Sequence, residues 1–211
     1  MTTAEEPHSR HPGPRRPPGA PVGPEEVRRA VLDASATLFA ERGIDRVSLR
    51  EIADMAGVHP GLIRRYIGKR EELVAAVFDD LNEQVAAEVV GHPLSGLGFG
   101  LESVVGRWAR VAGALMISGR TLVVSSEFNP VLAMAQTIEV GYRLDSRSAR
   151  LRAAQVVAAG LGWRLFEDYL IEAGTLDEFR IETIRDELAR SARRNAATPW
   201  PSPPDPPVQR D

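Results

Sequence analysis

The chain of 211 residues contains no cysteine, which excludes disulfide bonds, thiolate nucleophiles and every zinc or iron-sulfur site that needs cysteine ligands. It also lacks any run of the roughly 18 consecutive apolar residues that cross a bilayer, and residues 1–23 lack the apolar block of a signal peptide. We therefore expect a cytoplasmic protein without membrane association.

The sequence contains no paired-histidine metal motif, no glycine-rich phosphate loop after a strand and no nucleophile elbow. It accordingly predicts no metal, no cofactor and no enzymatic activity.

Proline is scarce in the middle of the chain and abundant at its two ends. Twelve of the sixteen prolines fall within residues 1–23 and 196–211, which carry little apolar surface. Such segments cannot sustain helices or bury a core, so we expect a disordered N-terminal arm and a disordered proline-rich tail. The folded body should span residues 24–195, and the hydrophobic content of the whole chain, 43 %, is near that of an average globular protein.

Apolar residues in this body recur at helical rather than alternating spacing, and no pair of strands is evident. Ser48 and Thr175 each precede a glutamate by three residues, which is the pattern of a capping box at the start of a helix. The sequence therefore predicts an all-α fold. The expected helices span residues 24–42, 48–56, 60–66, 69–90, 145–173 and 175–195.

Only the tripeptide Gly57-Val58-His59 separates the second and third of these helices, which is the spacing of a helix-turn-helix. The third helix would bury Ile63 and direct two adjacent arginines, Arg64 and Arg65, outward. Residues 59–70 carry four basic side chains and no acidic one, so positive charge is concentrated here although the whole chain has a net charge of -3.

One stretch of sequence adds a family resemblance. It reads Gly43-Ile44-x-x-Val47-Ser48-Leu49-Arg50-Glu51-Ile52-Ala53-x-x-Ala56-Gly57-Val58, followed by Gly61 and by Tyr66-Ile67-x-x-Arg70-Glu71-Glu72-Leu73. This pattern resembles the DNA-binding domain of TetR-type (tetracycline-repressor-like) transcriptional regulators. The resemblance implies an N-terminal helix-turn-helix domain at residues 24–68 and a larger helical ligand-binding and dimerisation domain at residues 69–195. The sequence departs from the family at Leu62, Arg64 and Ile67, so it does not specify an operator.

The resemblance also implies which side chains meet DNA. Phosphate contacts are expected from Ser48, Tyr66 and Arg70, with Lys69 adding positive charge, and base-edge contacts are expected from His59, Pro60, Leu62 and Arg65. Arg64 is assigned to either group. Arginine can bind guanine O6 and N7 together, and leucine can contact a thymine methyl group. The alternatives are a solvated arginine pair or ion pairs with Glu71 or Glu72, a packing role for Tyr66, and a capping role for His59.

The C-terminal half supplies candidates for dimerisation and ligand binding. The proposed dimer contacts lie on the last two helices and are Ala154, Ala158, Leu161, Leu165, Ile184 and Leu188. The proposed ligand contacts are large adaptable side chains, namely Trp108, Met116, Phe128, Met134, Tyr142, Trp163 and Phe166. Polar groups among them are Glu127, Gln136, Glu139 and Arg164. An ordinary intrachain core is the alternative for both sets.

These features together predict a homodimeric, sequence-specific regulator that binds double-stranded DNA at a palindromic operator. We expect a repressor that a small, mostly apolar effector releases from the operator, with an activator or a protein without an effector as the alternatives within DNA binding. A helical small-molecule carrier or a protein-interaction scaffold without operator binding is the alternative from another class. Arginines in the N-terminal arm either reach DNA or remain solvated.

Overall fold

The computed structural model describes residues 20–91, 103–119 and 129–199, and these residues form helices and no strand. The all-α expectation is therefore confirmed for the described part of the chain. The elements are α1 (Gly23–Arg42), the short 3-10 helix η1 (Ile44–Arg46), α2 (Leu49–Met55), α3 (Pro60–Tyr66), α4 (Arg70–Gly91), α5 (Val104–Ile117), α6 (Pro130–Tyr142), α7 (Ser146–Ala173) and α8 (Ile181–Ala197). No described helix has both the length and the apolar character needed to span a membrane.

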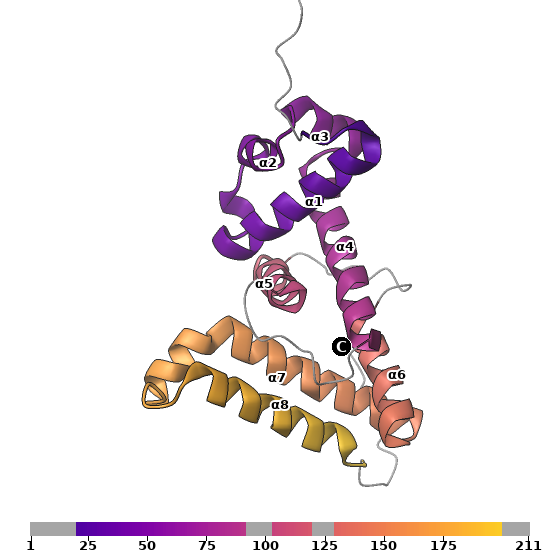
Figure 1. Ribbon diagram of the computed structural model, residues 1–211, viewed down its shortest axis with the longest axis vertical. Helices are drawn as coiled ribbons and strands as arrows, with labels where there is room; N and C mark the ends of the chain where they lie inside the picture. The colour runs from indigo at the N-terminus through magenta and orange to yellow at the C-terminus, as the bar shows by residue number, and fades with distance from the viewer. Residues whose placement is uncertain (1–19, 92–102, 120–128, 200–211) are drawn as a thin grey trace, which may run out of the picture.

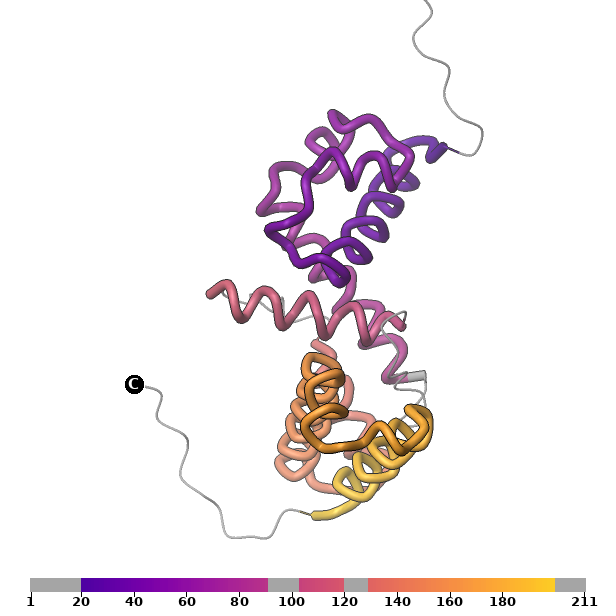
Figure 2. The backbone as a smooth tube through the Cα atoms, turned by 90° about the vertical axis from the view of Figure 1, so that its left-hand side faces the viewer, coloured from indigo at the N-terminus to yellow at the C-terminus, as the bar shows by residue number. Residues whose placement is uncertain are grey.

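The helices form an elongated molecule with two ends (Figure 1). Helices α1, α2 and α3 make up one end, and α7 and α8 lie side by side at the other. Helix α4 runs from the first end toward the second and packs against α6, while α5 lies across the middle and contacts both α1 and α7 (Figures 1 and 2). Helices α4 and α5 are thus the elements that join the helix-turn-helix to the rest of the protein.

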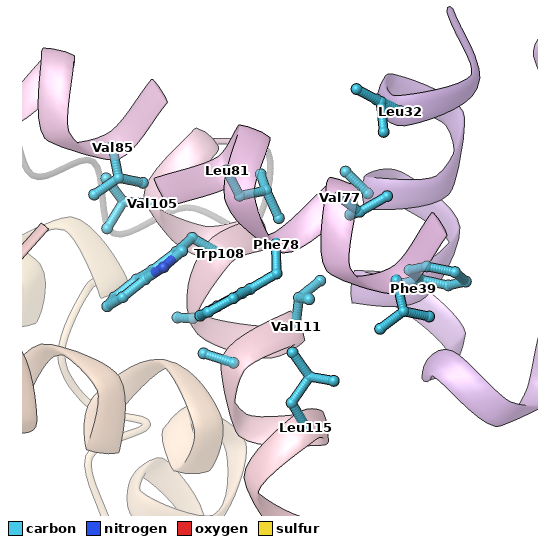
Figure 3. Close-up of a cluster of buried hydrophobic side chains, with 14 of the residues drawn as sticks. Leu32, Phe39, Val77, Phe78, Leu81, Val85, Val105, Trp108, Val111 and Leu115 are labelled. Carbon is cyan, nitrogen blue, oxygen red and sulfur yellow. The ribbon is translucent and has the colours of Figure 1, made fainter. Parts of the chain in front are cut away.

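A continuous apolar core joins α1, α4 and α5 (Figure 3). Its labelled members are Leu32 and Phe39 from α1, Val77, Phe78, Leu81 and Val85 from α4, and Val105, Trp108, Val111 and Leu115 from α5. Each of these side chains is at most 8 % exposed. Burial on this scale stabilises the fold by roughly 1.5–3 kcal/mol for each large side chain, so α4 is firmly held between the two ends of the molecule.

The capping box predicted at Ser48 is confirmed. The Ser48 hydroxyl accepts from the Glu51 backbone N–H at 3.2 Å, and the Glu51 carboxylate accepts from the Ser48 backbone N–H at 2.8 Å. Two donors at the start of α2 that would otherwise lack partners are satisfied in this way.

The capping box predicted at Thr175 is wrong. Thr175 has a φ of +53° and forms part of the end of α7, where its N–H donates to the Glu172 carbonyl and the Leu176 N–H donates to the Ile171 carbonyl. These paired bonds terminate a helix in the Schellman arrangement, and they occupy the residue that was expected to begin the next one. Helix α8 consequently starts at Ile181 rather than at residue 175.

The last helix also continues further than the sequence predicted. It ends at Ala197 instead of residue 195, and Ala196 is fully buried. The Arg152 side chain donates to the carbonyl oxygens of Thr198 at 2.6 Å and Pro199 at 3.0 Å, which holds the chain beyond the helix. Residues 196–199 therefore belong to the folded body, whereas the remaining residues of the two predicted disordered tails, 1–19 and 200–211, lie outside the described part of the structure.

Candidate DNA-binding surface

The turn between α2 and α3 is set by a glycine. Gly57 has a φ of +66°, and its N–H donates to the Asp54 carbonyl while the Val58 N–H donates to the Ala53 carbonyl. A left-handed residue at this position ends α2 abruptly and costs least when it is glycine. Val58 then packs against the core, so the chain turns sharply into α3.

The next residue fixes the beginning of α3. The His59 Nδ1 atom accepts a hydrogen bond from the Gly61 N–H at 3.1 Å, which confirms the capping role considered for this histidine. The imidazole is exposed, so its Nε2 atom remains available at the surface. Pro60, at the first position of the helix, suits the fixed backbone angle there.

Helix α3 is anchored on one side and exposed on the other. Ile63 is fully buried beneath it, and the half-buried Leu62 and Tyr66 flank this anchor. Arg64 and Arg65 are exposed, and the Arg65 guanidinium lies 5.4 Å from the centroid of the Tyr66 ring. The predicted outward orientation of the arginine pair is therefore confirmed. Tyr66 packs against the core and its ring also makes a cation–π contact with the Arg65 guanidinium.

The alternative in which these arginines pair with Glu71 or Glu72 finds no support within the described residues, where no ion pair of Arg64 or Arg65 is recorded. The Glu72 carboxylate instead accepts from the Lys69 backbone N–H at 2.6 Å, at the start of α4. The Lys69 side chain is exposed beside α3. The outer face of α3 thus keeps its positive charge.

Ser48 lies at the exposed start of α2, but its hydroxyl already has a partner. The hydroxyl donates to the Glu51 carboxylate at 2.7 Å, and Arg42 donates to the same carboxylate at 2.5 Å. Hydrogen bonds from the Ser48 backbone and hydroxyl, followed by the bond from Arg42, lower the pKa of Glu51 to about 2. The phosphate contact predicted for Ser48 would require its hydroxyl to leave this carboxylate.

The Arg70 side chain makes hydrogen bonds within the DNA-binding domain. Its Nη1 atom donates to the Val47 carbonyl at 2.8 Å, its Nη2 atom donates to the Ile44 carbonyl, and its guanidinium lies 6.0 Å from the Phe39 ring centroid. Because both terminal nitrogens point into the protein, Arg70 ties the start of α4 to the segment before α2. The structure therefore gives Arg70 a positioning role inside the DNA-binding domain, and the phosphate contact that the resemblance implied stays a prediction.

A cavity of about 120 Å³ lies in the C-terminal part, between helices α4, α5, α6, α7 and α8. Its lining residues are Val85, Val89, Val105, Trp108, Pro130, Met134, Val156, Val157, Ala159, Gly160, Leu161, Arg164, Leu188, Ser191, Ala192 and Asn195. Trp108 also donates from Nε1 to the buried Asn82 Oδ1 at 2.8 Å, so one wall of the cavity is hydrogen-bonded to α4. The cavity is mainly aliphatic, whereas the predicted ligand contacts are aromatic residues and methionines.

Of the predicted ligand contacts, only Trp108 and Met134 line this cavity within the described residues. Met116 lies near the end of α5, is 49 % exposed and does not line this cavity. Phe166 is 57 % exposed and lies where a non-helical backbone (φ -122°, ψ 15°) kinks α7.

The other predicted contacts also lie elsewhere. Tyr142 is half-buried at the end of α6, and Trp163 is buried with its Nε1 atom donating to Glu167 at 2.6 Å. Phe128 and the neighbouring Glu127 lie outside the described residues. Val85 and Val89, two valines spaced four residues apart on α4, line the cavity together with Arg164, and this helical spacing is the sequence signal that points to them.

The predicted dimer contacts divide into two groups. Ala154 and Ala158 are exposed on α7, while Leu161, Leu165, Ile184 and Leu188 are half-buried. Leu161 and Leu188 line the cavity, so both contribute to packing within the chain. Leu165 lies so close to Gly113 of α5 that a Cβ atom on that glycine would stand 2.8 Å from its Cδ2 atom.

Known proteins with a helix-turn-helix are similar to this chain. The model for bacterial regulatory proteins of the tetR family matches residues 31–77, which include α2, α3 and their turn. An HTH-type transcriptional repressor of Mycobacterium tuberculosis is 32 % identical over 175 residues, which cover 81 % of this chain and 91 % of the relative.

Solved structures share the fold. A TetR-family transcriptional regulator from Rhodococcus sp. aligns with 81 % of this chain and 99 % of its own, at 22 % identity and a TM-score of 0.51. A transcriptional regulator from Aquifex aeolicus aligns with 80 % of this chain and 98 % of its own, at 14 % identity and a TM-score of 0.50. With a relative matched along nearly its whole length and a helix-turn-helix in place, the chain belongs to the tetR family of bacterial regulatory proteins and is a DNA-binding transcriptional regulator.

Proposed function

We propose that this regulator is a homodimeric repressor that acts in the cytoplasm, binds a palindromic operator through α3 and leaves it when a small molecule occupies the cavity of the C-terminal part. The observation that carries the proposal is the exposed pair Arg64 and Arg65 on a helix whose start, turn and buried side are all fixed by local bonds and packing. An arginine held in this way can read guanine in the major groove, and each bidentate contact is worth about 1–3 kcal/mol against a wrong base.

The DNA contacts that we propose come from the exposed face of the motif. Base edges would meet His59 through its free Nε2 side, Pro60, Leu62 and Arg65. Arg64, Lys69, Ser48 and Tyr66 would add contacts to base edges or phosphates, in the division that the family resemblance implies. Half or more of the hydrogen bonds in such complexes go to the backbone, so these contacts set register while the base contacts set sequence.

The size of α3 supports dimerisation, because a helix of seven residues covers only a few base pairs. Two copies related by a two-fold axis would place two such helices about 34–36 Å apart, or a multiple of that distance, on one face of the duplex. The exposed alanines Ala154 and Ala158, with nearby exposed aromatic side chains at Phe166 and Tyr169, support an interface on α7 and α8.

Release by a small molecule is supported by the position of the cavity. Its lining includes α4, which continues directly from the helix-turn-helix, and Trp108, which is hydrogen-bonded to Asn82 on that same helix. A ligand that favours one position of α4 would change the separation of the two α3 helices in a dimer. Coupling of about 1–3 kcal/mol between two sites is typical of allosteric proteins.

The proposal is tested by selecting bound sequences from a pool of random DNA duplexes with the purified full chain. We expect a palindrome with two identical half-sites, and the double variant R64A/R65A should recover none. The exposed Arg29 on α1 gives a matched control, since R29A should recover the wild-type palindrome. Recovery of no preferred sequence by the wild-type protein would contradict operator binding and favour the carrier or scaffold alternative.

A further inference from the structure

Lys69 is the only lysine of the chain, and the other 25 of its 26 lysine and arginine residues are arginines. An arginine guanidinium stays protonated and is a poor nucleophile, whereas a lysine amine is a target of acetylation. Besides the N-terminal amine, Lys69 is therefore the one amine that an acetyl donor can modify. The rest of the positive charge that could meet DNA comes from arginines, which acetyl donors leave unchanged.

Lys69 lies in the short connection between α3 and α4, and its backbone is held from two sides. Its N–H donates to the Glu72 carboxylate at 2.6 Å. The next residue, Arg70, donates from its guanidinium to the Val47 and Ile44 carbonyls. The backbone on which the lysine side chain stands is thus fixed next to the exposed face of α3.

The side chain of Lys69, in contrast, is open to solvent. Lys69 is exposed, and no ion pair or hydrogen bond of its amine is recorded within residues 20–91, 103–119 and 129–199. The nearby Glu72 carboxylate accepts from the backbone of Lys69 through Oε2 rather than from the amine. A reagent can therefore reach the amine without displacing a partner.

We propose that Lys69 is an acetylation site through which the affinity for DNA is lowered. This inference rests on the proposed contact between Lys69 and DNA. Acetylation removes one positive charge, so the modified side chain no longer pairs with a phosphate. Arg64 and Arg65 keep their charges, so affinity falls for DNA of every sequence while the preferred sequence stays the same.

The acetyl donor is an acyl phosphate or an acyl thioester, because each presents a carbonyl carbon with a good leaving group. After its ammonium group has lost a proton to water, the Lys69 Nζ atom attacks that carbonyl carbon. The N–C amide bond forms and the bond to the leaving group breaks, which expels phosphate or thiolate with the bonding electron pair. The nitrogen then gives a second proton to water, and no oxidant or reductant takes part.

The test treats the purified full chain with acetyl phosphate in one arm and acetyl-coenzyme A in the other, which distinguishes the two donors. Peptide mass spectrometry should find acetyl groups on Lys69 and on the N-terminal amine in at least one arm. Duplex DNA in excess should slow the modification of Lys69, because bound DNA covers the amine.

DNA affinity is then measured against salt for treated and untreated protein. Loss of one phosphate contact reduces the slope of log affinity against log salt by about one, which at about 0.15 M salt is a roughly fivefold loss of affinity for each subunit. K69Q should resemble the acetylated wild type. The control is K69R, whose affinity after treatment should equal its own affinity before treatment, since only its N-terminal amine reacts.

Three results would overturn the inference. The first is a Lys69 that stays unmodified in both arms while the N-terminal amine reacts. The second is full acetylation of Lys69 with unchanged affinity and salt slope, and the third is an equal loss of affinity by treated K69R. Binding is measured on mixed-sequence duplex DNA as well as on any selected palindrome, so failure of operator recognition by the untreated protein is distinguished from failure of this inference.

Discussion

Replacing Arg70 separates the structural role seen here from the phosphate contact that the family resemblance implied. The Arg70 guanidinium donates to the Val47 and Ile44 carbonyls, across sequence separations of 23 and 26 residues. Hydrogen bonds from a charged donor contribute about 1.5–3 kcal/mol each. The side chain is half-buried and water can partly replace it, so we take the lower value for each of the two bonds.

The variant R70M keeps most of the apolar stem and removes both bonds, so the free energy of unfolding should fall by about 3 kcal/mol. For a chain of this size that loss corresponds to a decrease of roughly 6–12 °C in the melting temperature. Urea unfolding followed by circular dichroism measures the free energy, and thermal unfolding provides a second value. The exposed Lys69, one residue earlier, gives a matched control, because K69M should leave stability nearly unchanged.

DNA binding by the same two variants completes this prediction. A residue that contacts a phosphate reduces the slope of log affinity against log salt by about one when it is removed. At a temperature where R70M is folded, its salt slope should equal that of the wild type. An unchanged unfolding free energy combined with a reduced salt slope would refute the positioning role of Arg70.

Three further predictions concern the same domain. R64A and R65A should each weaken operator binding by about 1–3 kcal/mol in fluorescence anisotropy while leaving the melting temperature unchanged, since both side chains are exposed; a parallel loss of stability would contradict this. G68A should lower the free energy of unfolding by about 1–3 kcal/mol, measured in urea, because Gly68 has a φ of +122° and an added Cβ would stand 2.2 Å from a carboxylate oxygen of α4. The control variant G141A should leave stability nearly unchanged, because open space surrounds Gly141. The folded-state pKa of Glu51 lies at about 2, below its ordinary value of 4.5, so the ionised carboxylate contributes fully to the free energy of unfolding above about pH 5 and loses this contribution as the pH falls toward 2. E51Q should therefore lose less stability than the wild type over that pH range. Identical acid unfolding profiles of the two proteins would contradict the capping network.

The sequence predicted the helix-turn-helix well because its determinants are local. The Ser48 capping box and the left-handed Gly57 act within a few residues, and the burial of Ile63 follows from helical spacing. The same kind of signal was misleading at Thr175, because a threonine can either start a helix or, as here, take a left-handed conformation that ends one.

The cavity and the role of Arg70 depended on tertiary structure that no short pattern encodes. Five helices contribute side chains to the cavity, and Phe166 on the kinked α7 is not among them. The partners of Arg70 lie in a segment more than 20 residues earlier in the chain, and a family pattern gives no indication of which way its guanidinium points. The type of each residue therefore indicated which side chains could bind DNA or a ligand, whereas the direction in which each side chain points could be learned only from the fold.

Whether α3 reads base sequence is tested most directly by repeating the selection from random duplexes with R65Q. Glutamine favours adenine where arginine favours guanine, so the recovered palindrome should change at one symmetry-related position in each half-site and remain the same elsewhere. Recovery of the wild-type palindrome by R65Q with full enrichment would show that the exposed face of α3 does not read that base.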